Sequence, residues 1–562
     1  MRQDEAQTYL INNMQIQRVI LLNQIKAQYP NLIFNEIGSN LYTVTVQPQF
    51  ESEFNAFRAK LEFVSLPILY GLNANQALEA SNITLFHSSA FGELRGRGII
   101  IGFVDTGIQY TNELFKNANN TTRIVGIWDQ TITSGAPPQK YNYGTYYNEN
   151  RINEALAAED PYTVVPSRDE NGHGTYLAGV AAGNDQMTEG GYVGGAPDAD
   201  ILVVKLREAT VSLKEHYLVE PNVVAYAEND VIAGISFLVE ESVRQQKPLV
   251  ICLGLGSNYG AHNGTNILER YLETLSLAQN IIIIIAAGNE SNLGHHYEGT
   301  ITTGEIQELE INVAENSTGF PIYLWTTLPD KLTVSVKSPL GQVVEKVPIL
   351  PNQSQVYRFN LEQTELTITY IYPDPETGGE KIEIRLKAPT PGLWTINMIG
   401  EDVVNGIFHM WLPRKDFIRE ATRFLKAAPD TTIQIPATAE YTIAIGAYDY
   451  VDGSIYIGSG RGPTTAAILK PDFIAPGVNV EGPSISGGMT TYVGTSTAAA
   501  VTAGAAAILM QWAVIRENLP QMNTRIARVI FMRGAMRQRG VTYPNNIEGY
   551  GKLDLRASIA NI

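Results

Sequence analysis

The sequence is poor in cysteine, because Cys252 is the one thiol among 562 residues. A lone cysteine excludes an internal disulfide framework and every zinc or iron–sulfur site that is built from several thiolates. Positive charge is also scarce: 40 lysine and arginine residues stand against 57 aspartate and glutamate residues, a formal net charge of −17. A surface of that sign repels phosphate backbones, so we expect no nucleic-acid partner.

Two kinds of hydrophobic segment are missing as well. Residues 1–13 are polar and include two acidic side chains, whereas a secretory signal begins with basic residues and continues with an apolar core. We therefore expect no ordinary export and an intracellular location. Residues 497–515 carry no charge, but alanine dominates this run and polar residues interrupt it. It predicts a buried helix of a folded protein rather than a membrane span, so no membrane partner is expected.

The hydrophobic and charged fractions, 44% and 17%, are those of an ordinary folded protein, and periodicity divides the chain into blocks. In the first block, apolar residues recur at helical spacing in two stretches, Val19 to Tyr29 and Phe50 to Leu61, and residues 41–46 have the pattern of a strand. We expect a small α/β domain over residues 1–72.

From Gly98 the pattern changes to uninterrupted apolar runs that are followed by glycine-rich turns and helical stretches. Such runs are typical of strands buried on both faces, as in a parallel sheet covered by helices. The runs are residues 99–104, 201–206, 249–253 and 281–285, and the pattern returns at 441–447. The fold class is therefore α/β, and reactive groups are expected at the carboxyl ends of these strands.

Between these α/β segments the pattern alternates with a period of two. The alternating runs begin near Leu309, Leu332, Leu366 and Ile382, and prolines and glycines separate them. Short alternating strands between turns predict an antiparallel sandwich or jelly roll. We assign residues 295–435 to this inserted domain, and residues 73–294 and 436–562 to the two parts of the α/β domain.

Two motifs carry residues that are suited to acid–base chemistry. Asp105 follows the apolar run 99–104 and precedes a glycine turn, a pattern that also occurs in aspartic proteases and in plain turns. His173 lies between two glycines at the start of a helical run of small residues. Flanking glycines let another backbone or a substrate approach closely, and a packed core histidine is the alternative.

Two further motifs offer a nucleophile and an oxyanion donor. Ser496 stands at the amino end of the alanine-rich helix, where a hydroxyl is either an N-cap or a nucleophile beside free backbone N–H groups. Asn289 follows the isoleucine run 281–285, and it is either a turn residue or a side-chain donor to a developing oxyanion. Each motif alone leaves both interpretations open.

The four motifs together supply a nucleophile, a base, a residue to orient the base and an oxyanion donor, each at a strand end or a helix start. In chain order the triad is Asp105, His173 and Ser496, which is the order in subtilisin and differs from that in chymotrypsin and the α/β-hydrolases. In these motifs, and in the α/β pattern that joins them, the sequence resembles the subtilisin-like serine proteases. The resemblance implies a serine endopeptidase in which Asn289 helps to form the oxyanion hole.

The same resemblance implies where a substrate binds. Gly254, Leu255 and Gly256 are expected to line one side of the primary specificity pocket, with Ala287 and Gly288 on the opposite side. The chemistry of such an enzyme requires no cofactor.

Calcium often stabilises subtilases, which leaves a structural metal open. Asn184 and Asp185 lie in a plausible loop, although carboxyl and amide groups in loops are more often merely solvated.

A narrower resemblance comes from the spacing of the motifs. The 207 positions from Asn289 to Ser496 exceed what the two expected α/β units of about 30 residues each need, and the surplus is the alternating block. An N-terminal module, an intact triad and a jelly-roll-like insertion at this point resemble the clostridial Csp germination proteases, as do residues 494–499 and 127–130.

This narrower resemblance implies a biological role. The resemblance to the subtilases implies that the N-terminal module is a prodomain that assists folding and is cut by the protease itself within residues 66–76, and we expect it to stay bound after cleavage. The substrate would be a protein precursor, a spore cortex-lytic proenzyme, and the protease would be packaged in the spore. Two alternatives are a non-catalytic Csp-like pseudoprotease that acts in signalling or as a scaffold, and a general intracellular or host-facing bacterial protease.

The inserted domain is expected to act as a rigid clamp on the catalytic core rather than as a separate substrate-binding arm. It begins within ten residues of Asn289 and returns directly to core strands, so no long flexible linker is evident. Its large aromatic residues are most simply its own core, and any that face outward would pack against the protease domain; these are Trp325, Trp394, Phe408 and Trp411.

Overall fold

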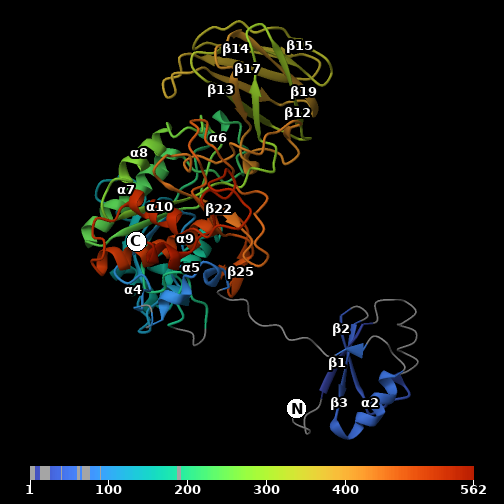
Figure 1. The fold of residues 1–562 in the computed structure, drawn as a ribbon, viewed down its shortest axis with the longest axis vertical. Helices are drawn as coiled ribbons and strands as arrows, with labels where there is room; N and C mark the ends of the chain where they lie inside the picture. The colour runs from blue at the N-terminus through green and yellow to red at the C-terminus, as the bar shows by residue number, and fades with distance from the viewer. Residues whose placement is uncertain are drawn as a thin grey trace. The chain divides into compact units, whose positions relative to one another are not determined.

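The structure is a computed structural model of the chain, in which two compact units are divided between Asn73 and Ala74 (Figure 1). The sequence pattern predicts this boundary one residue earlier, between residues 72 and 73. The residues that the structure describes are 7–12, 26–38, 41–59, 64–65, 76–88, 90, 92–186 and 191–562.

The first unit contains a four-stranded antiparallel sheet with the order β2-β3-β1-β4. Its strands are β1 (Gln7–Asn12), β2 (Ile33–Gly38), β3 (Leu41–Val46) and β4 (Val64–Ser65), and its helix α2 spans Glu51–Arg58. Phe57 of α2 is buried, and its ring lies 5.5 Å from that of Tyr29 and 5.3 Å from that of Phe34. The helix at 51–58 and the strand at 41–46 therefore follow the sequence pattern.

Other parts of this unit differ from the sequence pattern or lie outside the described residues. Residues 7–12 form the strand β1, although the sequence analysis treated them only as a polar start. Most of the helix expected between Val19 and Tyr29 lies outside the described residues, as do Leu61 and the expected cleavage segment up to residue 75.

The second unit is built on an eight-stranded sheet with the order β23-β22-β10-β9-β5-β8-β6-β7. All its neighbouring strands are parallel except β6 and β7. The strands are β5 (Ile100–Asp105), β6 (Ile124–Asp129), β7 (Thr145–Asn148), β8 (Asp200–Lys205), β9 (Leu249–Leu253), β10 (Ile281–Ala286), β22 (Ile443–Tyr448) and β23 (Phe473–Pro476). The predicted parallel sheet is confirmed, with strand ends shifted by one or two residues.

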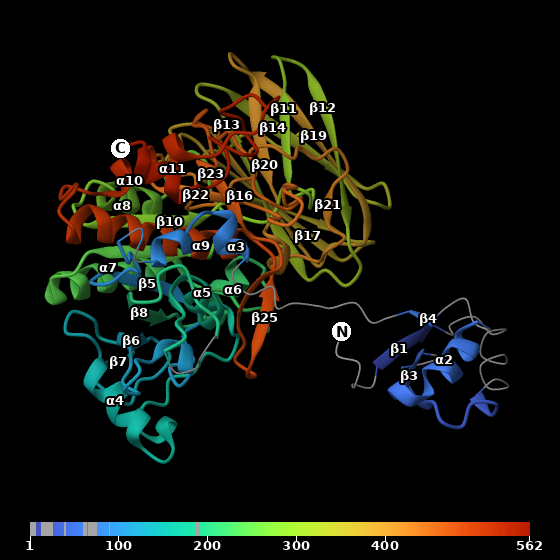
Figure 2. The ribbon, with the colours of Figure 1, turned by 60° about the horizontal axis from the view of Figure 1, so that its bottom comes forward.

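Helices cover both faces of this sheet because its strands are apolar on both faces. Ile101 and Phe103 of β5 pack into the same cluster as α5 (His173–Ala182) and α9 (Thr495–Met510), whereas Ile100 and Val104 pack with α7 (Glu228–Gln245). Figure 2 shows α5 beside α9 and α7 across the sheet from them. The remaining helices are α3 (Gln76–Ala80), α4 (Glu149–Ala157), α6 (Val211–His216), α8 (Ile267–Leu275), α10 (Thr524–Gly534) and α11 (Leu555–Ala560).

Helix α9 is the alanine-rich run that raised the question of a membrane span. With the π-helical turn Gln511–Ile515 it forms a 21-residue apolar helix of mean hydropathy 1.8, long enough by composition to cross a bilayer. It is 83% buried inside the protein, and it packs against α5, β9, β10 and β22. Its apolar character is thus accounted for by the core that it fills.

Two facing antiparallel sheets form the segment between β10 and β22 (Figure 1). The six-stranded sheet contains β11 (His296–Thr300), β20 (Ile407–Trp411), β13 (Gly319–Thr326), β18 (Lys381–Lys387), β17 (Thr364–Ile371) and β16 (Ser354–Phe359). The five-stranded sheet contains β15 (Val343–Val344), β14 (Lys331–Lys337), β19 (Gly392–Asp402), β12 (Ile306–Val313) and β21 (Arg423–Phe424). We call residues 296–424 the β domain. A separate hairpin, β24 (Val480–Pro483) and β25 (Met489–Tyr492), precedes α9.

The large aromatic residues of the β domain divide into two groups. Trp394 and Phe408 are buried in the core between its sheets. Trp325 and Trp411 instead join a separate cluster with Ala261 of the catalytic part. The indole of Trp411 stacks on the imidazole of His262 with ring centroids 4.2 Å apart. Half of the set therefore faces the protease core.

Candidate active site

The three triad residues meet at the carboxyl end of the parallel sheet. Asp105 is the last residue of β5, His173 is the first residue of α5 and Ser496 lies in the first turn of α9. The Nδ1 atom of His173 is 2.8 Å from Oδ1 of Asp105, and its Nε2 atom is 3.2 Å from Oγ of Ser496. Residues separated by up to 391 positions are thus joined in one hydrogen-bonded chain, from carboxylate to imidazole to hydroxyl.

Close approach of two backbones places α5 against the end of β5. Gly174 has no side chain because a Cβ there would lie 2.2 Å from the carbonyl oxygen of Gly107. Gly172 precedes the helix with a φ of +92°, a conformation that L side chains rarely adopt. The glycines on both sides of His173 therefore serve the contact that brings its imidazole to Asp105.

A residue that the sequence analysis did not assign, Asp169, holds the start of α5. Its Oδ1 accepts hydrogen bonds from the N–H of Gly172 and the hydroxyl of Thr106, each at 2.8 Å. Its Oδ2 accepts from the N–H and the hydroxyl of Thr175, at 2.9 and 2.7 Å. The sequence feature that could have indicated this role is a carboxylate four residues before the first residue of the helix, because acidic side chains are favoured near helix starts.

The pKa of His173 is raised above its usual 6.5. Burial alone would lower this pKa, but the negative charge of Asp105 and its hydrogen bond to Nδ1 outweigh burial, and Asp169 adds to the effect. Because Asp105 takes the Nδ1–H, the neutral imidazole presents an unprotonated Nε2 to Ser496. The ring is therefore set up to accept the hydroxyl proton.

The side chain of Asn289 is oriented by residues of α9. Its Oδ1 accepts a 3.0 Å hydrogen bond from the backbone N–H of Thr495, a group that can only donate. The Nδ2 of Asn289 is consequently the end of the amide that is left to donate. The N–H of Ser496, in the first helical turn, has no acceptor four residues earlier within the helix. Both N–H groups of the expected oxyanion hole are thus available as donors.

Comparison with known proteins agrees with this geometry. The subtilase family matches residues 96–369 and 422–551, which is more than half of the chain. The chain belongs to the subtilase family.

Three relatives show which known proteases the chain is similar to. A relative of known structure, the CspB protease of Clostridium perfringens, is 31% identical with a TM-score of 0.77, and the match covers 87% of this chain and 99% of that one. Subtilisin-like protease SBT3.5 of Arabidopsis thaliana is 26% identical over 74% of this chain and 56% of its own length. The intracellular serine protease of Paenibacillus polymyxa is 24% identical over 36% of this chain and 45% of its own length. The chain thus spans about half the length of these two relatives.

The residues expected to line the specificity pocket of this subtilase differ in burial and in what they contact. A Cβ on Gly254 would lie 3.0 Å from Cε1 of His173 and 3.3 Å from Cβ of Ser496, so this glycine borders the catalytic residues directly. Leu255 is half-buried. Ala287 is fully buried, and its side chain packs into the core behind the pocket rather than into open space. Gly256 and Gly288 both contact the side chain of Gln434, which the sequence analysis did not assign.

Other groups in the subtilase are remote from this chemistry. The thiol of Cys252 is buried in β9, and burial raises its pKa, so it is unsuited to nucleophilic attack. The amide of Asn184 donates to the carbonyl of Lys116 at 3.1 Å and accepts from the N–H of Gln186 at 3.2 Å. Among the described residues no three His, Cys, Asp or Glu side chains gather as a metal site would need. Calcium binding near Asn184 and Asp185, which the sequence left open, is not tested by these contacts.

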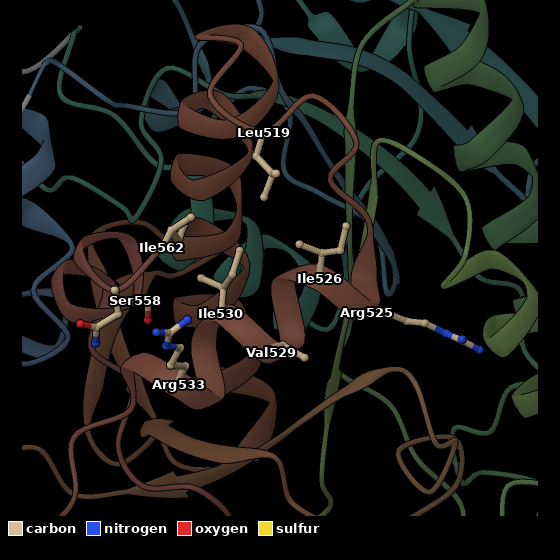
Figure 3. Close-up of a pocket in the computed structure, with 9 residues that line it drawn as sticks. Leu519, Arg525, Ile526, Val529, Ile530, Arg533, Ser558 and Ile562 are labelled. Carbon is tan, nitrogen blue, oxygen red and sulfur yellow. The ribbon is translucent and has the colours of Figure 1, made fainter.

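An apolar groove lies apart from the triad, at the C-terminal helices (Figure 3). Leu519, Ile526 and Ile530 line it, together with Ile562, whereas Arg525 points away and stacks over the ring of Tyr441. None of its lining residues belongs to the triad or to the expected pocket.

Proposed function

We propose that this chain is a serine endopeptidase that cleaves its own prodomain and then activates a protein precursor by limited proteolysis. The observation that carries the proposal is the position of His173, within hydrogen-bond reach of both Asp105 and Ser496. A nucleophile, a base and an orienting carboxylate in that order are what acyl transfer requires. A pseudoprotease that only binds would have no use for this alignment.

The proposed reaction uses only side chains and backbone groups of the chain. His173 takes the proton of Ser496 as Oγ attacks the peptide carbonyl, while Asp105 holds the imidazole and stabilises its charged form. Asn289 and the N–H of Ser496 donate to the oxyanion. His173 then protonates the leaving amine, and water repeats the cycle on the acyl-enzyme. No cofactor takes part, and calcium would act only on stability.

We further propose that the precursor is a spore cortex-lytic proenzyme and that the protease is packaged in the spore. Support comes from the motif resemblance to the Csp germination proteases and from the likeness to the CspB protease. The prodomain would be the first unit, cut within residues 66–76 and retained on the enzyme.

The direct test is to incubate the purified protease with a purified cortex-lytic proenzyme. Wild type should cut the proenzyme at one bond and Ser496→Ala should leave it whole. A deletion strain should then germinate slowly and accumulate uncut proenzyme. Normal germination with normal processing in that strain would remove the germination role, and proteolysis of the proenzyme into many fragments would favour a general protease.

A further inference from the structure

Gln434 fills the space between the two glycines of the expected specificity pocket. Its side chain is 4% exposed. A Cβ on Gly256 would lie 2.7 Å from Oε1 of Gln434, and a Cβ on Gly288 would lie 2.5 Å from its Cγ and 2.8 Å from its Oε1. Both glycine walls of the expected pocket therefore have no side chain at the place that Gln434 occupies. The amide occupies the room that a large substrate side chain would need.

Backbone groups of the β domain determine which end of the Gln434 amide faces this space. The carbonyl oxygen of Leu412 can only accept, and it lies 3.1 Å from Nδ2 of Asn258. The same Nδ2 lies 3.5 Å from a carboxylate oxygen of Glu290. Asn258 must therefore turn its Oδ1 toward Gln434, whose Nε2 donates to it at 3.0 Å. This chain of contacts leaves Oε1 of Gln434, an acceptor, between the two glycines.

A cation contacts the backbone of the same wall. Arg414, from the end of the β domain, donates from Nη1 to the carbonyl oxygen of Gly256 at 2.8 Å and pairs through Nη2 with Asp416 at 2.6 Å. Its charge reaches the triad, where it acts against protonation of His173. The nearby carboxylate of Glu290 is buried and is held by His295 at 2.6 Å. Both nearby carboxylates, Asp416 and Glu290, are therefore already paired, and a positively charged substrate side chain would find no free carboxylate there.

We propose that Gln434 is a specificity-determining residue, and that it makes the protease prefer glutamine or asparagine immediately before the cleaved bond. This inference rests on the proposed protease function and names its substrate class. A neutral amide donates an N–H to Oε1 of Gln434, whereas methionine or leucine of similar size would leave that acceptor unpaired. Aromatic side chains are excluded by the volume of Gln434, and lysine is disfavoured because its charge would be buried there without a free carboxylate.

The test uses quenched peptides that differ only at the residue before the cut: Gln, Asn, Met, Leu, Lys or Phe. For the full-length wild-type protease after self-cleavage, kcat/KM for Gln should exceed that for Met by about tenfold or more, and Asn should exceed Leu similarly. Gln434→Met keeps the volume and removes the acceptor, so the Gln-to-Met ratio should fall to near one. Gln434→Gly opens the pocket and should raise cleavage after Phe.

Gln511→Met is the matched control, because Gln511 is also 4% exposed but accepts hydrogen bonds from Arg95 and Gly96, away from the triad. It should leave every ratio unchanged. Cleavage of none of the peptides or of any protein by wild type would overturn the proposed function itself. Cleavage with Met, Leu or Phe preferred in the wild type, or ratios that Gln434→Met does not move, would overturn the role of Gln434 and leave the protease function standing.

Discussion

Replacing Asp169 by alanine should slow catalysis without removing any atom that touches the substrate. The substitution leaves two buried backbone donors, the N–H groups of Gly172 and Thr175, without their acceptor. Each buried donor that loses its partner costs about 1–3 kcal/mol, so the free energy of unfolding should fall by about 2–6 kcal/mol. Because α5 then loses its anchored start, His173 should shift relative to Ser496. A displacement of that kind costs on the order of 10²-fold in kcat.

The assay must separate a misplaced histidine from a merely weakened fold. We would measure kcat, KM and the pH dependence of kcat/KM below the unfolding temperature, and the stability by urea titration. Asp169 also contributes to the raised pKa of His173, so its removal should move the acid limb of the pH profile to lower pH. KM should change much less than kcat, because the substrate contacts stay in place.

Asp330→Ala is the matched control for this experiment. Asp330 is 1% exposed in the β domain and accepts from the backbone N–H groups of Val404, Asn405 and Gly406 at 2.6, 3.0 and 2.6 Å. Its removal should also lower stability and leave kcat and the pH profile unchanged. If Asp169→Ala loses stability yet keeps the wild-type kcat and acid limb, the positioning role is wrong.

Four further outcomes are expected. Asn289→Ala should lower kcat by ~10²–10³ with little change in KM, as single-turnover kinetics would show, because one oxyanion donor is lost. The acid limb of kcat/KM should lie above pH 6.5, since His173 must be neutral to act and its pKa is raised; Asp105→Asn should shift this limb to lower pH and reduce kcat by about 10⁴. Wild type should separate into two polypeptides on folding while Ser496→Ala stays whole on a denaturing gel, and two intact single bands would refute self-processing. On heating with an added protease, the β domain should resist until the core melts, whereas early release of an intact fragment near residues 297–435 would contradict a clamp.

The features of the fold that the sequence predicts best are those encoded by local patterns. Uninterrupted apolar runs predicted β9 and β10 within one residue, because strands buried on both faces consist almost entirely of apolar residues. The triad was predictable because each member lies in a short motif at a strand end or helix start. The orientation of the Asn289 amide was not, since it depends on Thr495, 206 positions later.

The sequence did not predict residues whose role depends on partners far away in the chain. Gln434 has no motif, and the glycines that make room for it lie 178 and 146 positions earlier in the chain. Trp411 likewise faces out of the β domain, where it stacks on His262 of the α/β part of the chain. In both cases a pattern of period two or 3.6 specifies the face of an element and carries no information about what covers that face.

The central claim, that Ser496 is an activated nucleophile, is tested most directly by labelling the folded chain with a fluorophosphonate probe and mapping the label by mass spectrometry. We predict one label per chain on Ser496, and none in Ser496→Ala under the same conditions. A folded wild-type protein that never acquires the label, with its first unit either attached or removed, would contradict the claim and favour a binding protein.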